Sequence, residues 1–194
     1  MQLKNILLLL STALFVIACS STKTQEADDS ASDRTDLMQK GFLLSLPEEE
    51  KWSVAKKGDY MVMLSKQGEN GADRYTIQTL VVTLPTFEDD NQFLEFIENR
   101  IATSQKDANV TEHSASFFTG DNQICVQYNS KEKSKNTDGA AQTLEIVSFT
   151  CRHPDNANAG VYIALSKSYA PGTSEEDLAA KATEIFNRLY FTEL

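Results

Sequence analysis

The chain has 194 residues, 28 of them acidic and 18 basic, which gives a formal net charge of −10 at pH 7. An acidic chain without a stripe of Lys and Arg is unsuited to nucleic acid, because phosphate binding releases counterions only where cations cluster. The short basic segment Lys131-Glu132-Lys133-Ser134-Lys135 is interrupted by Glu132 and Ser134, so it predicts a solvated surface loop. We therefore expect no nucleic-acid partner.

The first residues have the layout of a leader for export. Lys4 precedes a run of apolar residues from Ile6 to Ile17. A basic start followed by about 7 to 15 apolar residues is typical of a secretory signal. A transmembrane helix would need about 20 such residues, so a membrane span is the weaker interpretation. We assign residues 1–18 to a signal peptide.

A cysteine closes this apolar run. The residues Val16-Ile17-Ala18-Cys19 resemble a bacterial lipobox, in which aliphatic and small residues precede the cysteine. The resemblance implies cleavage after Ala18, a diacylglyceryl group on the Cys19 thiol, and a further acyl chain, such as palmitate, on the new amine. It also implies a lipoprotein that is held in the cell envelope by lipid alone. The alternative is an ordinary secretory signal in which Cys19 is incidental.

The residue after the cysteine bears on location. Ser20 in this position is similar to the second residue of lipoproteins that are sorted onward. If the cell has an outer membrane, this favours an anchor there, with the body facing the periplasm.

Residues 19–40 are rich in Ser, Thr, Asp and Glu, and only Leu37 and Met38 are sizeable apolar residues. Such a composition cannot bury a core, so we predict a lipidated cysteine followed by a disordered tether.

Residues 41–194 have the composition of a single domain, and their patterns predict strands and two helices. Phe93, Phe96, Ile97 and Ile101 recur at helical spacing, which predicts a helix over about 88–104. Its start, Glu88-Asp89-Asp90, is an N-terminal cap in preference to a calcium site, since it lacks the spacing of calcium ligands. The strands are predicted at 42–46, 52–55, 60–64, 74–84, about 110–118, 123–130, 143–151 and 160–168.

A second helix is predicted near the end of the chain. Thr173-Ser174-Glu175-Glu176 is a capping box that would open it. Its apolar face would consist of Leu178, Ala182, Ile185, Phe186 and Leu189. Strands separated by two amphipathic helices predict an α+β fold, in which the helices cover a twisted, mostly antiparallel sheet.

This order of elements resembles the PsbP-like αβα sandwich. The segments that carry the resemblance are Phe42–Pro47, Trp52, the paired strands, a first helix, and a closing helix that ends at 185–191. DcrB-type and LpqN-type envelope lipoproteins share that fold. The resemblance implies a protein that binds partners or assists assemblies, and it carries over no active-site residue.

Two cysteines remain once Cys19 is set aside. Cys125 and Cys151 lie in two β-type runs that are symmetric about Asp138-Gly139. Antiparallel strands joined there would place the two cysteines opposite each other, as a disulfide requires. An exported protein would keep such a bond oxidised. A metal pair and a redox dithiol are the alternatives, and neither has a supporting CxxC motif or histidine cluster.

The remaining patterns assign no catalytic, cofactor-binding or metal-ligating residue. His113 and His153 lack a metal-ligand spacing, and surface imidazole is the default interpretation. Met61 and Met63 alternate with apolar residues, so their strand is either central in the sheet or has one face that meets something. We favour the core interpretation, because helices on both sides of the sheet would cover the strand. We expect a non-catalytic binding or assembly module with an envelope protein partner. The alternatives are an envelope enzyme such as a hydrolase and a carrier of a lipidic ligand.

Overall fold

A computed structural model describes residues 36–46, 50–69, 71–104, 109–120, 123–136, 138–172 and 177–194. The signal peptide, the cleavage point after Ala18 and the lipid attachment at Cys19 lie outside these residues and remain predictions. None of the described helices is long and apolar enough to cross a membrane.

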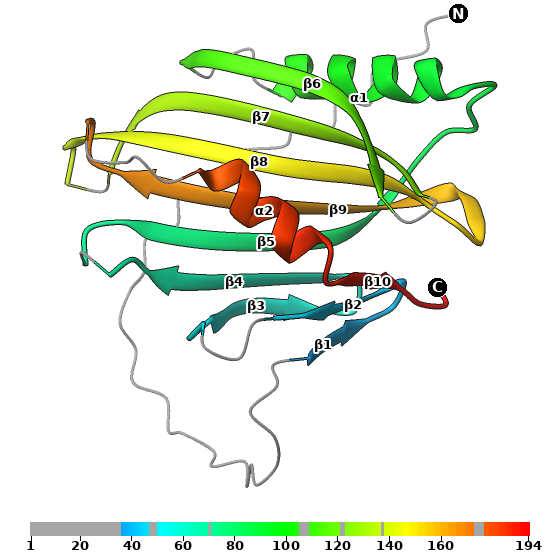
Figure 1. Ribbon diagram of the computed structural model, residues 1–194, viewed down its shortest axis with the longest axis horizontal. Coiled ribbons are helices and arrows are strands. Elements are labelled where there is room, and N and C mark those ends of the chain that lie inside the picture. The colour runs from blue at the N-terminus through cyan, green and yellow to red at the C-terminus, as the bar shows by residue number, and fades with distance from the viewer. Residues whose placement is uncertain are drawn as a thin grey trace, which may run out of the picture. The chain divides into compact units, whose positions relative to one another are not determined.

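Seven antiparallel strands form the main sheet (Figure 1). They are β3 (Ser53–Gly58), β4 (Met61–Gln67), β5 (Arg74–Thr83), β6 (Val110–Gly120), β7 (Gln123–Lys135), β8 (Ala141–His153) and β9 (Asn156–Tyr169). Their order across the sheet is β3-β4-β5-β9-β8-β7-β6. The predicted strands are all present, and β7 extends to Lys135. The basic segment Lys131–Lys135 is therefore part of a strand, and the prediction of a loop there was wrong.

A second sheet has three short strands in the order β1-β2-β10, namely β1 (Asp36–Gln39), β2 (Phe42–Ser45) and β10 (Leu189–Phe191). The sequence placed β1 in the disordered tether and β10 in the closing helix. Leu37 in β1 and Leu189 in β10 are both buried. The folded body therefore includes residues 36–39, and the boundary predicted at residue 40 lies too late in the chain.

The two helices lie against different faces of the main sheet. Helix α2 (Leu178–Phe186) packs on β8 and β9, and helix α1 (Asp90–Ser104) packs on β6 and β7. Figure 1 shows α2 across β8 and β9, and α1 beside β6. We call the two sides of the main sheet the α2 face and the α1 face. The small sheet lies on the α2 face, because Phe42 and Leu44 belong to the same hydrophobic core as α2.

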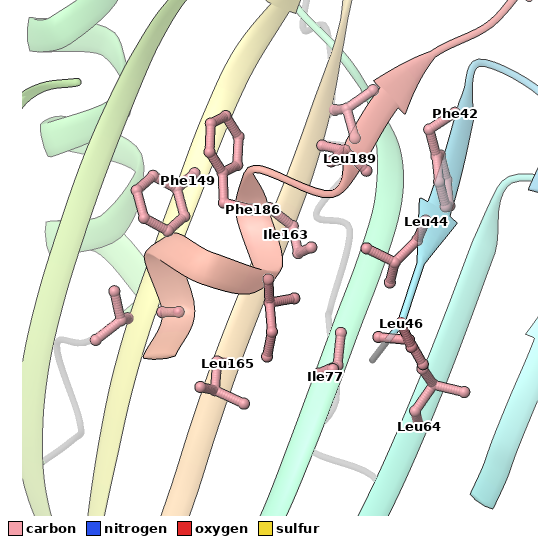
Figure 2. Packing of buried hydrophobic residues seen from close by; sticks show 14 of the residues in the cluster. Phe42, Leu44, Leu46, Leu64, Ile77, Phe149, Ile163, Leu165, Phe186 and Leu189 are labelled. Atoms are coloured by element: carbon pink, nitrogen blue, oxygen red, sulfur yellow. The ribbon is translucent and has the colours of Figure 1, made fainter. Parts of the chain in front are cut away.

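The main core fills the space between the α2 face, α2 and the small sheet. Figure 2 shows Phe186 of α2 beside Phe149 of β8, and their ring centroids are 4.5 Å apart. Phe118 of β6 packs edge-on against both rings, at 5.0 and 5.2 Å. A second, smaller core lies under α1 and is built from Leu84, Phe93, Ile97 and Val126.

The predicted fold class was wrong. The described residues form two sheets and two helices, of 15 and 9 residues, so the fold is β-rich and is not a sheet covered by two amphipathic helices. The physical reason is that two segments predicted as tether and helix form strands β1 and β10, which pair with β2. The resulting small sheet covers part of the main sheet in place of a helix. The second helix ends at Phe186, and Leu189 of its predicted stripe is in β10.

Both helix starts are capped by aspartate. The Asp89 side chain accepts from the amide N–H of Gln92 at 2.9 Å, which confirms the capping role of Glu88-Asp89-Asp90. At α2 the capping side chain is Asp177, which accepts from the N–H of Ala180 at 3.1 Å. The predicted capping box at 173–176 lies outside the described residues.

The β7–β8 hairpin has the predicted turn. Gly139 has a φ of +82°, and the side-chain oxygen of Asn136 accepts from the N–H groups of Asp138 and Ala140. The register that this turn sets pairs Cys125 with Cys151, and the two form the predicted disulfide, with 4.1 Å between Cα atoms. Both cysteines are fully buried in the main core.

Candidate functional site

A groove runs along the α1 face of the sheet, between α1 and the strands that α1 leaves uncovered. It has a volume of about 250 Å³. Strand β5 contributes Leu80 and Val82, the helix contributes three residues, and β8 and β9 contribute one each. The full lining, called the α1 groove below, is Leu80, Val82, Ile97, Arg100, Ile101, Thr150 and Tyr162.

The floor of the groove follows from strand register. Met61 pairs with Leu80, Leu80 with Tyr162, and Tyr162 with Thr150, so one row of side chains crosses β4, β5, β9 and β8. Alternation along β4 turns Val62 and Leu64 into the main core, where both are fully buried. Met61 and Met63 therefore point to the α1 face, where they are only half-buried.

The two methionines are half-buried, so the interpretation that they belong to the core was wrong. Their strand lies between β3 and β5, but the helix on their side packs on β6 and β7, at the other end of the sheet. Half-buried Met61, Met63, Leu80 and Val82 continue the groove as an apolar surface. Methionine adapts its shape to what it contacts, so such a surface suits a ligand of irregular shape.

Two hydroxyl groups interrupt the apolar floor. The Tyr162 hydroxyl is hydrogen-bonded to the buried Ser148 side chain, and Thr150 next to it is buried. Burial raises the pKa of Tyr162 above its ordinary value of 10.0, and the hydrogen bond to Ser148 lowers it by less. The phenol therefore stays protonated at neutral pH and provides a hydroxyl to a bound polar group.

A cation stands at the rim of the groove. Arg100 is on α1, three residues after Ile97 and one before Ile101, and it is exposed. The spacing of apolar residues predicted the stripe of this helix, but Arg100 was not predicted as a site residue. The sequence feature that could have indicated Arg100 is its spacing of three residues from Ile97, because residues three apart lie on the same side of a helix. An apolar floor with hydroxyls and a cationic rim fits an apolar or amphipathic ligand with a polar group.

A cluster of charged and aromatic residues on the α2 face is a second candidate. The Nζ atoms of Lys66, Lys167 and Lys181 lie 5.4, 5.2 and 4.8 Å from the centroid of the Tyr75 ring. Trp52 packs against the main core, and Lys66 Nζ lies 4.9 Å from the centroid of its ring.

Two carboxylates contact the three ammonium groups of this cluster. Asp73 lies 3.2 Å from Lys167 Nζ, and Glu50 contacts both Lys66 and Lys181. Lys167 and Asp73 are both buried. Since each ammonium group already has a carboxylate, the cluster is a structural network that joins α2 to the sheet.

The two histidines occupy different environments. His113 is exposed on β6, as expected of surface imidazole. His153 is buried, so the default interpretation was wrong for it. Its Nδ1 accepts from the N–H of Asp155 at 3.2 Å, and its Nε2 therefore donates to the carbonyl oxygen of Thr192 at 2.9 Å. This imidazole ties the C-terminal segment to the end of β8.

Comparisons with solved structures give distant likenesses. A mutant of protein Mog1 matches with a TM-score of 0.50 and 12% sequence identity, over 82% of this chain and 96% of that chain. The cyanobacterial PsbP protein of Synechocystis sp. PCC 6803 matches with a TM-score of 0.44 and 7% identity, over 87% of this chain and 98% of that chain. No family model matches the sequence, and no curated protein matches it.

At 12% identity the Mog1 likeness shows a shared fold and nothing more. The solved structures that this chain is similar to also include PsbP. No site residue is transferred from either protein, and the α1 groove is derived from this chain alone.

Proposed function

We propose that this chain is a lipid-anchored lipoprotein of a bacterial cell envelope whose folded body is a non-catalytic binding or assembly module. The anchor is proposed from the leader and from Cys19. Each acyl CH₂ that enters a bilayer contributes about 0.8 kcal/mol, so two or three chains on one cysteine hold a protein stably. The buried Cys125–Cys151 disulfide supports an exported location, because such bonds persist in oxidising compartments.

The proposed binding role rests on one observation, which is the half-buried apolar surface that lines the α1 groove. Leu80 and Val82 are half-buried at the side of α1, which packs mainly on β6 and β7. Folding alone leaves part of their apolar surface in water, and contact with a partner would remove it. Exposed apolar surface of this kind is characteristic of interaction sites.

The anchor is tested by replacing Cys19 with Ser and fractionating cells, with Ser21→Ala as the matched control in the same segment. We expect Cys19→Ser to move the protein from the membrane fraction to the soluble fraction, and Ser21→Ala to leave it in place. If the Cys19→Ser protein still sediments with membranes through a high-salt wash, the anchor is not the lipid.

The binding role is tested by placing a photo-crosslinking amino acid at Leu80 in living cells. The control position is Val54, an exposed apolar residue on β3, at the sheet edge beyond β4. We expect an adduct of defined mass at Leu80 and none of that mass at Val54. Identical adduct patterns at the two positions, or no adduct at Leu80, would contradict a binding role for the groove.

Carriage of a lipidic ligand is the second candidate, and the exposed Arg100 beside an apolar floor favours it. A guanidinium at the rim would pair with a carboxylate or phosphate while the chain lies on Leu80 and Ile97. The probe is a fluorescent long-chain fatty acid. We expect Arg100→Ala to weaken binding of the fatty acid several-fold. Arg188→Ala, at a partly exposed arginine two residues after α2 and outside the groove lining, should have no effect. Equal affinities for both variants would contradict this candidate.

A further inference from the structure

The two edges of the main sheet differ in how well they are protected against another strand. Unpaired N–H and C=O groups along an edge bind extended chains unless lysines, prolines, bulges or short length prevent it. At one edge, β3 has six residues, includes Lys56 and Lys57, and is broken by a bulge between Val54 and Lys56. This edge has three of the usual protections.

The opposite edge, β6, lacks most of them. It is 11 residues long and has no Lys, Arg or Pro. Its single irregularity lies between Val110 and Glu112, and from Glu112 to Gly120 the pairing with β7 runs without a shift. No described strand pairs with β6 on its outer side, and residues 111–114 and 116–117 are exposed. A regular ladder of backbone groups thus remains available along most of β6.

Apolar side chains mark one end of this edge. Phe117 is 41% exposed on the α1 face. Its neighbour Phe118 points to the α2 face, where it packs against Phe149 and Phe186 but stays half-buried. A strand added beside β6 would place one side chain over each ring. The edge therefore combines hydrogen-bonding groups with apolar surface on both faces.

Carboxylates mark the other end. Exposed Glu112 lies 3.9 Å from Lys131 of β7, but Glu145 shares that lysine at 3.8 Å, so these three side chains keep a net negative charge. Glu98 of α1 lines a hollow of about 640 Å³ beside His113 and Ser114 of β6. A second copy of this chain would bring the same acidic groups and a further formal charge of −10 to the edge. A basic segment is the complementary occupant.

We propose that β6 is a docking edge for an extended, basic segment of a partner protein, which pairs with it as an additional antiparallel strand. Strand addition of this kind takes its affinity from main-chain hydrogen bonds and its specificity from alternate side chains. Because the added strand runs antiparallel to β6, the partner segment would have two adjacent apolar residues, one opposite Phe118 and the next opposite Phe117. A basic residue opposite Glu112 would follow five positions after the second of them. This surface is separate from the α1 groove, so either can fail without the other.

The probe is a displayed library of random peptides long enough to span β6, selected on the purified body. We expect the selected peptides to share an apolar pair followed by Lys or Arg. We expect Phe117→Lys to weaken their binding about tenfold to a hundredfold, which corresponds to the burial of one phenylalanine. The matched control is Val54→Lys, which places the same residue on the protected β3 edge and should leave the affinity unchanged.

A second measurement uses the unmodified protein, so that a folding defect in a variant does not decide the result. The best peptide is N-methylated at alternate residues in two versions, one blocking the N–H groups that face β6 and one blocking those that face away. Strand addition predicts loss of binding for the first version and retention for the second. Equal behaviour of the two versions, no enriched peptide, or a dimer in sedimentation that Phe117→Lys abolishes would overturn the proposal.

Discussion

The disulfide is expected to hold the hairpin together chiefly by restricting the unfolded chain. It joins residues separated by 26 positions, and the chain-entropy relation gives about 3.5 kcal/mol for a loop of that size. For a domain of this length, 1 kcal/mol corresponds to about 2 to 4 °C, so the melting temperature should fall by about 7 to 14 °C without the bond. Because both cysteines are fully buried, reductant should act only after the protein has been unfolded.

The assay is urea unfolding of three proteins: the oxidised protein, the protein reduced while unfolded and then refolded with its thiols blocked from reoxidation, and the variant with Cys125→Ala and Cys151→Ala. The midpoint should fall in both modified proteins, with the alanine variant slightly less stable because it also loses packing around two buried sulfurs. If the free energy of unfolding of the reduced protein is within about 1 kcal/mol of that of the oxidised protein, the bond does not stabilise the fold by restricting the unfolded chain.

Two further predictions concern buried polar groups. Lys167→Ala should destabilise the protein by about 3 to 5 kcal/mol, because it leaves Asp73 buried beside a lost cation, whereas Lys167→Met combined with Asp73→Leu should cost far less. Chemical denaturation of both variants tests this, and equal losses would contradict it. The pKa of Tyr162 is raised in the folded state, so the native protein binds that proton more tightly, and stability should fall as the pH rises above about 10. Tyr162→Phe should reduce this fall in a comparison of melting temperatures against pH, and an unchanged profile would contradict it.

Local sequence patterns were enough to predict the main sheet, because its strands are long and well bounded. The symmetry of the runs around Asp138-Gly139 gave the register of β7 and β8, and with it the cysteine pair. The small sheet could not be predicted this way. Strand β1 has four residues and β10 has three, and both form only because β2 lies between them. A helical pattern that reached Leu189 was overridden by this pairing, which joins segments from opposite ends of the chain.

Local sequence patterns predict the α1 groove even less well than they predict the small sheet. Alternation along β4 places Met61 and Val62 on opposite faces, but it does not tell which face will be covered. That depends on strand order: β9 inserts between β5 and β8, which brings Tyr162 beside Leu80, while α1 packs at the other end of the sheet. The same order leaves β6 at the edge. The groove and the open edge are thus consequences of long-range topology. Only two local sequence features indicated the groove: the two-sided apolar pattern of Met61 and Met63, and Arg100 within an apolar helical stripe.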